Sequence, residues 1–87
     1  MAGQMFYTYI IQSLSRPEQR YIGHTADFRQ RLADHNAGKC SHTSKFRPCK
    51  VGIYVAFETI EHAQSFEKYL KSGSGHAFAK RHFWNAI

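Results

Sequence analysis

The first two dozen residues show a pattern that is typical of a β-hairpin. Residues 6–13 (FYTYIIQS) are aromatic and β-branched, which favours a strand. The polar segment 15–19 predicts a turn, because Pro17 has no N–H to donate to a strand ladder. Arg20–His24 then predicts a short second strand, so the chain is expected to begin with two antiparallel strands.

The next segment predicts a helix followed by a loop. Thr25 or Asp27 can cap a helix that continues to about Asn36, and Asn36-Ala37-Gly38 is a suitable stop. Residues 40–48 then form a polar loop that is rich in basic side chains.

The second half predicts one more strand and two more helices. Thr59 can cap a helix from Ile60 to about Lys71, and residues 75–84 predict a last short helix. Before them, residues 51–57 predict a strand whose alternating apolar residues are expected to share one face; these are Val51, Ile53, Val55 and Phe57. The predicted order is ββα-loop-βα-α, an α/β (α+β) fold with a small three-stranded antiparallel sheet flanked by helices.

The composition separates this chain from disordered and secreted proteins. Its 87 residues are 43% hydrophobic and 15% aromatic, so we expect one domain, residues 1–87, with a core at about 5–84. No apolar run reaches the roughly 18–20 residues of a membrane span, and the N-terminus lacks a secretory pattern. Two cysteines are too few for a disulfide scaffold, so a cytoplasmic location is expected. The net charge of +6 favours a polyanionic partner, above all nucleic acid.

Polar residues occupy positions on two predicted helices where apolar residues are expected. On the first helix, Arg31 and His35 fall on the side that Phe28 and Leu32 mark as buried. On the second helix, Glu67 falls inside the apolar stripe. That stripe consists of Ile60, Ala63, Phe66 and Leu70.

Glu67 has two interpretations, because a carboxylate on an inward face is costly unless it is paired, hydrogen-bonded or bound to a metal. One is an ion pair between Arg31 and Glu67 that holds the helices together. The other is a site in which Glu67 holds a metal ion while Arg31 and His35 bind an anion. Tyr9 and Tyr21 are either half-buried packing residues or bring their hydroxyls to this site. Together these groups suit hydrolysis of a phosphodiester.

Several short motifs resemble those of the GIY-YIG nuclease family. They are Tyr7-Thr8-Tyr9, Tyr21-Ile22-Gly23, Asp27-Phe28-Arg29-Gln30-Arg31-Leu32 with His35, and the stretches 35–39, 42–48 and 67–73. The resemblance covers about Met5 to Trp84. It is closest to compact, stand-alone bacterial members that are related to the nuclease module of the excision-repair incision subunit. The literal string Gly52-Ile53-Tyr54 follows Tyr21-Ile22-Gly23 instead of preceding it, so it belongs to the third strand.

The resemblance implies a role for each residue that matches a family motif. Tyr9 and Tyr21 line the site, and one of them helps to activate the attacking water. Arg31 contacts the scissile phosphate, and His35 assists proton transfer. Glu67 holds one divalent cation, Mg²⁺ or Mn²⁺, with water and phosphate as further ligands.

Basic side chains near the motifs are candidates for contacts to the nucleic-acid backbone. They are His24, which directly follows the second motif, and the loop residues Lys39, His42, Lys45, Arg47 and Lys50. The alternative is a loop that is only solvated. Cys40, His42 and Cys49 do not have a recognised zinc spacing, so zinc is not expected.

The leading prediction is a metal-dependent endonuclease that hydrolyses phosphodiester bonds in DNA. No appended module supplies base readout, so selection by structure is expected instead of selection by sequence. One alternative is a non-catalytic nucleic-acid-binding module that uses the same basic surface. Another is an accessory subunit in which the Arg31–Glu67 pair is architectural. A protein partner that targets the substrate is compatible with each of these, and the oligomeric state stays open.

Overall fold

The structure of the chain, a computed structural model, describes residues 4–39 and 44–84. Its strands form one antiparallel sheet in which β1 (Phe6–Ser13) lies in the centre. Strand β2 (Arg20–Thr25) forms one edge of the sheet, and β3 (Cys49–Phe57) forms the other. The predicted hairpin and the three-stranded antiparallel sheet are confirmed.

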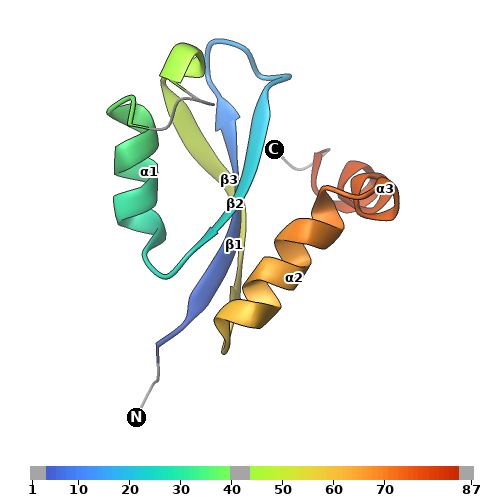
Figure 1. The fold of residues 1–87 in the computed structure, drawn as a ribbon. Coiled ribbons are helices and arrows are strands. Elements are labelled where there is room, and N and C mark those ends of the chain that lie inside the picture. The colour runs from blue at the N-terminus through green and yellow to red at the C-terminus, as the bar shows by residue number, and fades with distance from the viewer. Residues whose placement is uncertain (1–3, 40–43, 85–87) are drawn as a thin grey trace.

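The helices lie on both faces of this sheet. Helix α1 (Phe28–Asn36) covers one face, whereas α2 (Ile60–Leu70) and α3 (Gly73–His82) lie on the other (Figure 1). A short 3₁₀ turn, η1 (Ser44–Phe46), precedes β3. The predicted α+β fold is therefore confirmed, and it places two helical layers around a thin sheet.

Capping residues set the helix boundaries close to their predicted positions. The side chain of Asp27 accepts a backbone N–H in the first turn of α1, and Thr59 does the same for α2. Helix α1 ends before Gly38, which has a φ of 81°, a conformation that glycine adopts at low cost. Strand β3 begins two residues before the predicted position, and α3 spans Gly73–His82 instead of 75–84.

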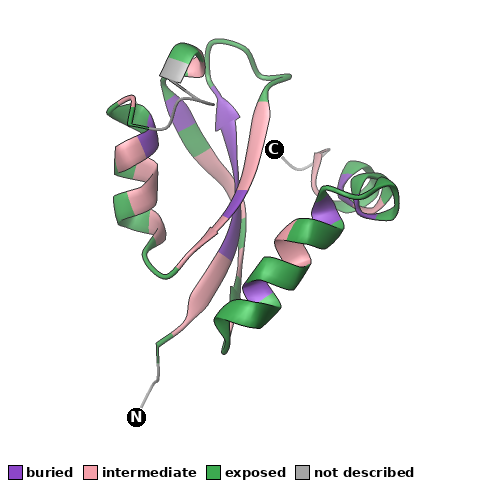
Figure 2. Cartoon of the chain, viewed as in Figure 1, coloured by how far each residue is buried: buried purple, intermediate pink, exposed green. Residues whose placement is uncertain are grey.

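Strand β1 is buried on both faces and forms the centre of the core (Figure 2). Tyr9 and Ile11 pack in the cluster that faces α1, whereas Ile10 packs against α2 and α3. The buried hydroxyl of Thr8 donates to the carbonyl of Ala63 at 2.7 Å, which ties β1 to α2. Because side chains alternate along a strand, each polar residue of β1 and β2 is assigned to one helical layer.

A register shift between Ile10 and Ile11 corrects one prediction about β3. Val51 pairs with Ile11 and joins the cluster that faces α1, whereas Ile53 pairs with Ile10. The alternating residues of β3 therefore do not share one face, because an irregularity in the ladder reverses the side-chain direction beyond it. Ile60, predicted in the buried stripe of α2, is exposed because it is the first residue of that helix.

Candidate active site

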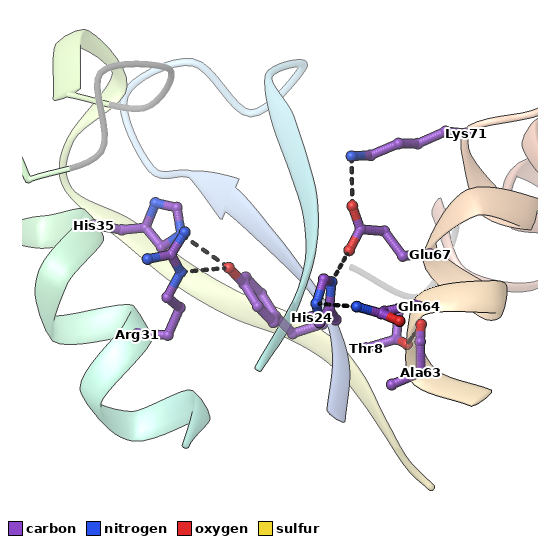
Figure 3. A network of polar contacts seen from close by, with 9 residues as sticks. Thr8, His24, Arg31, His35, Ala63, Gln64, Glu67 and Lys71 are labelled. Carbon is purple, nitrogen blue, oxygen red and sulfur yellow. Dashed lines mark hydrogen bonds and ion pairs between the residues drawn. The ribbon is translucent and has the colours of Figure 1, made fainter. Parts of the chain in front are cut away.

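The predicted site residues form two polar groups, one on each face of the sheet. The α1-side group consists of Tyr9, Tyr21, Arg31 and His35. The α2-side group consists of His24, Gln64, Glu67 and Lys71. Figure 3 shows Arg31 and His35 on the α1 side of strand β2, and Glu67 with Lys71 on the α2 side. Strand β2 therefore separates the guanidinium from the carboxylate.

The hydroxyl of Tyr9 is the centre of the α1-side group. Its oxygen lies 3.1 Å from Nε2 of His35 and accepts a hydrogen bond from Nε of Arg31 at 3.3 Å. Tyr9 and His35 are only 2% and 0% exposed, whereas Arg31 is half-buried. The ring of Tyr21 packs against that of His35, with centroids 4.9 Å apart. The structure thus brings together four of the predicted catalytic residues.

The electrostatics of the α1-side group favour a charged Arg31 and a neutral His35. The hydrogen bond to Tyr9 raises the pKa of Arg31, against a smaller opposing effect of burial, and Tyr21 raises it further. Burial lowers the pKa of His35, and the charge of Arg31 lowers it further, while Asp34 opposes this shift. A neutral His35 can accept the Tyr9 proton at Nε2 while Arg31 donates to the Tyr9 oxygen.

Gly23 on the edge strand gives the Tyr9 ring the space that it occupies. A Cβ at Gly23 would lie 2.5 Å from the Tyr9 hydroxyl oxygen and 2.7 Å from its ring carbon Cζ. The two residues are also partners in the β1–β2 register. Any larger residue would push the ring away, so the glycine of the second motif allows the Tyr9 hydroxyl to lie against β2.

Glu67 is held at both carboxylate oxygens by neighbouring side chains. Nδ1 of His24 lies 2.5 Å from Oε1, and Nζ of Lys71 donates to Oε2 at 2.7 Å. The Glu67 side chain is 19% exposed. Burial alone would raise the pKa of Glu67, but the hydrogen bonds with Lys71 and His24 outweigh it, and the pKa is lowered. Glu67 is therefore an ionised carboxylate at the edge of the sheet.

The predicted ion pair between Arg31 and Glu67 is wrong. Glu67 pairs with His24 and Lys71, and Arg31 bonds to Tyr9 on the opposite face. Helical periodicity correctly assigns Arg31 and Glu67 to inward-facing positions. It does not indicate which face of the sheet each helix covers, so two inward residues need not meet.

The α2-side group includes one residue with a different predicted role and two residues that were not predicted. His24, predicted to contact nucleic acid, lies against Glu67, and its Nε2 is 3.4 Å from the side-chain nitrogen of Gln64. Lys71 was not predicted, although its spacing of four residues from Glu67 is a known signal for a helical pair. No sequence signal indicated Gln64.

The described basic residues of the predicted nucleic-acid surface are exposed. They lie between the end of α1 and the first residues of β3, and they are Lys39, Lys45, Arg47 and Lys50. Arg47 packs its guanidinium over Gly38, and Nζ of Lys39 lies 3.7 Å from Asp34. His42 lies outside the described residues. The contact of these basic residues with phosphates stays a prediction.

Residues 4–39 and 44–84 contain neither a cluster of metal-ligating side chains nor a helix that could span a membrane. No group of three or more His, Cys, Asp and Glu side chains in these ranges is arranged to hold a metal ion. In the same ranges, none of the helices has the length and apolar character needed to cross a membrane.

Comparisons with known proteins agree with the motifs. A UPF0213 protein of Streptococcus pyogenes serotype M3 is 33% identical over 72 residues, which are 82% of this chain and 76% of that protein. A UPF0213 protein of Streptococcus pyogenes serotype M1 gives the same values. The family model of the GIY-YIG catalytic domain matches residues 5–81. The chain therefore belongs to the GIY-YIG family of nucleases.

Proposed function

We propose that this protein is an endonuclease that hydrolyses phosphodiester bonds in DNA with the help of one divalent cation. Membership of a nuclease family implies a nucleic acid as partner. The observation that carries the proposal is the α1-side group, in which a charged Arg31 is fixed by the buried pair Tyr9–His35. A guanidinium that is fixed in this way before substrate binds is suited to stabilise the negative charge of a phosphate.

In this proposal Arg31 binds the scissile phosphate. A guanidinium can donate to two phosphate oxygens at once, and it stabilises the additional negative charge of the transition state. Because Tyr9 holds Nε, the guanidinium is oriented in the free protein, which reduces the entropy lost on binding.

Tyr21 is better placed than Tyr9 to contact the attacking water. The hydroxyl of Tyr9 is buried between Arg31 and His35, whereas Tyr21 is half-buried on the edge strand. We assign Tyr21 to the water, and Tyr9 to the orientation of Arg31. We assign the transfer of the released proton to His35, whose ring packs against that of Tyr21.

The phosphate is proposed to lie at the outer edge of β2. The Tyr9 hydroxyl lies over Gly23 on one face, and Glu67 contacts His24 on the other. Gly23 and His24 are consecutive, so their Cα atoms are only about 3.8 Å apart. A strand of DNA that crosses this edge would therefore meet both polar groups at one phosphate.

Glu67 fits a site that holds a divalent cation through a single carboxylate. GIY-YIG nucleases generally use divalent metals, and Mg²⁺ commonly binds one or two carboxylates and completes its shell with water and phosphate. When bound, the cation polarises a phosphate oxygen. His24 and Lys71 each contact one Glu67 oxygen in this structure, so both side chains compete with an ion for this carboxylate.

A cleavage panel with a matched pair of variants tests the proposal. Nicked, branched, single-stranded and duplex DNA, and RNA of the same sequences, are incubated with Mg²⁺ or Mn²⁺. We expect cleavage of at least one structured DNA by the native protein and a loss of at least about a hundredfold for Glu67→Gln. Glu61→Gln, an exposed carboxylate on the same helix, should cleave normally.

The outcomes of this panel separate the candidate functions. Metal-dependent cleavage that survives Glu67→Gln contradicts the assigned role of Glu67. Binding of DNA without cleavage of any substrate favours the non-catalytic alternative. Preference for a branched or nicked DNA over duplexes of different sequence supports selection by structure.

A further inference from the structure

A partly exposed aromatic cluster lies on the α1 face of the sheet, beside the α1-side group. It consists of Tyr7 on β1, Phe28 at the start of α1 and Tyr54 on β3. The rings of Phe28 and Tyr54 are stacked, with centroids 4.6 Å apart and an interplanar angle of 21°. Tyr7 packs edge-on against both rings, at 5.1 and 5.8 Å. Tyr54 is nevertheless 50% exposed.

The strand register and the helix spacing connect this cluster to the proposed phosphate site. Tyr54 pairs directly with Tyr9, so the two side chains lie on the same face of adjacent strands. Phe28 precedes Arg31 by one turn of α1, which is about 5 Å along the helix axis. The aromatic stack therefore lies one helical turn from the residue whose guanidinium is proposed to bind the scissile phosphate, on the same face of the sheet.

An open cavity of about 360 Å³ adjoins the cluster and carries polar groups at its rim. Its lining includes Tyr7, Phe28 and Tyr54 together with Arg29 and Asp27. The Asp27 carboxylate is used at the N-terminus of α1, where it accepts the backbone N–H of Gln30. Arg29 supplies a positive charge beside the rings, on a chain whose net charge is +6. This combination suits a nucleic-acid strand, because bases stack on aromatic rings while cations contact the phosphates.

We propose that the Tyr7–Phe28–Tyr54 cluster stacks one or more unpaired bases next to the phosphate that is cut, so that the enzyme selects DNA with a single-stranded segment at the cleavage position. This inference rests on the proposed function, because it takes Arg31 as the phosphate contact. Paired bases are stacked on each other and are not available to the cluster. Lys39, Lys45, Arg47 and Lys50, at the opposite end of α1, then contact the phosphates on the other side of the cleaved bond.

Binding without cleavage tests the inference directly. Two DNA probes of identical sequence carry 2-aminopurine, in one case in an unpaired extension and in the other within a blunt duplex. Affinity is measured by fluorescence anisotropy and stacking by quenching of 2-aminopurine, both in EDTA. We expect Tyr54→Ala to weaken binding of the extended probe by about fivefold to a hundredfold and to leave binding of the blunt duplex within about twofold. Tyr54→Phe should retain both the affinity and the quenching.

Tyr69→Ala is the matched control, because Tyr69 is a similarly exposed tyrosine (40%) on α2, behind the opposite face of the sheet. It should bind both probes as the native protein does. Thermal unfolding of each variant checks that the fold is retained. If native protein binds both probes and Tyr54→Ala weakens them equally or not at all, the stacking inference fails while the nuclease proposal stands. A change of oligomeric state without a change of DNA affinity assigns the cluster to a protein interface and also overturns it. If native protein binds neither probe, the stacking inference fails, while the nuclease proposal is decided by the cleavage panel with Mg²⁺ or Mn²⁺.

Discussion

The two faces of the sheet hold polar groups of different character. On the α1 side, Arg31 is fixed by Tyr9 and His35, which are almost completely buried. On the α2 side, Glu67 is held by the exposed Lys71 and the half-buried His24. The first group is organised before substrate arrives, whereas the second can exchange its partners with solvent. We infer that the α1 side orients the substrate and that the α2 side admits the cation.

The largest expected effect comes from removing the Arg31 guanidinium from the α1-side group. Arg31→Ala should reduce the cleavage rate by at least about a hundredfold, because a fixed donor to transition-state charge is lost. The single-turnover rate measures this effect. Arg16→Ala removes the same charge from an exposed turn and serves as the control. Native-like cleavage by Arg31→Ala would contradict the role of Arg31, and an equal loss of rate in both variants would show that only net charge matters.

Gly23→Ala should disturb the α1-side group through its packing. The added methyl group would collide with the Tyr9 ring, so we expect a loss of about 1–3 kcal/mol in the free energy of unfolding. Gly73→Ala is the matched control, since a Cβ there meets no atom within 4 Å. Urea unfolding of both variants gives the comparison, and a Gly23→Ala protein as stable as Gly73→Ala would refute the packing argument.

The two groups should contribute to the free energy of unfolding of the protein in different pH ranges. The pKa of His35 is lowered in the folded protein, so the unfolded chain binds its proton more readily and stability falls as the pH drops below about 6.5. The pKa of Glu67 is also lowered, so its contribution is complete above about pH 4.5 and is lost as the pH falls through the folded-state pKa.

Single substitutions distinguish the pH-dependent contribution of His35 from that of Glu67. Urea midpoints are measured from pH 7.5 to 3.5. We expect His35→Gln to reduce the dependence of the midpoint on pH near pH 6, whereas Glu67→Gln should reduce this dependence only in the acid range. A His35→Gln profile parallel to that of the native protein between pH 5 and 6.5 would contradict a buried, neutral His35.

The smallest expected effect concerns the exchange of partners at Glu67. Lys71→Met removes an exposed pair four residues along the helix, so stability should change by less than about 1 kcal/mol. The same change frees one carboxylate oxygen and removes a competing positive charge, so the Mg²⁺ concentration for half-maximal cleavage should fall a few-fold. An increase in that concentration would indicate that Lys71 assists the bound cation.

The sequence was sufficient to predict the helices and strands and to identify the polar residues at inward-facing helix positions. Strand composition, capping at Asp27 and Thr59, and helical periodicity predicted the layout, with boundaries wrong by at most about two residues. Local rules act within a few residues, which explains this success. They do not indicate how helices are distributed over the two faces of a sheet, so the partners of Arg31 and Glu67 could not be predicted.

Two further features depended on long-range pairing. The register shift between Ile10 and Ile11 reverses the side-chain direction along β3 and places Val51 on the face opposite to that of Ile53. Strand alternation alone gives no sign of such an irregularity. His24 is separated from Glu67 by 43 residues, and only the packing of α2 on the sheet brings them together.

The central claim is that the two groups act on one phosphate across the edge strand. Single-turnover cleavage rates for Arg31→Ala, Glu67→Gln and the double variant test it most directly. If both residues stabilise the same transition state, the double variant should cleave little more slowly than the slower single variant. A double variant whose rate loss equals the product of the two single losses would show that the groups act independently and would contradict the account.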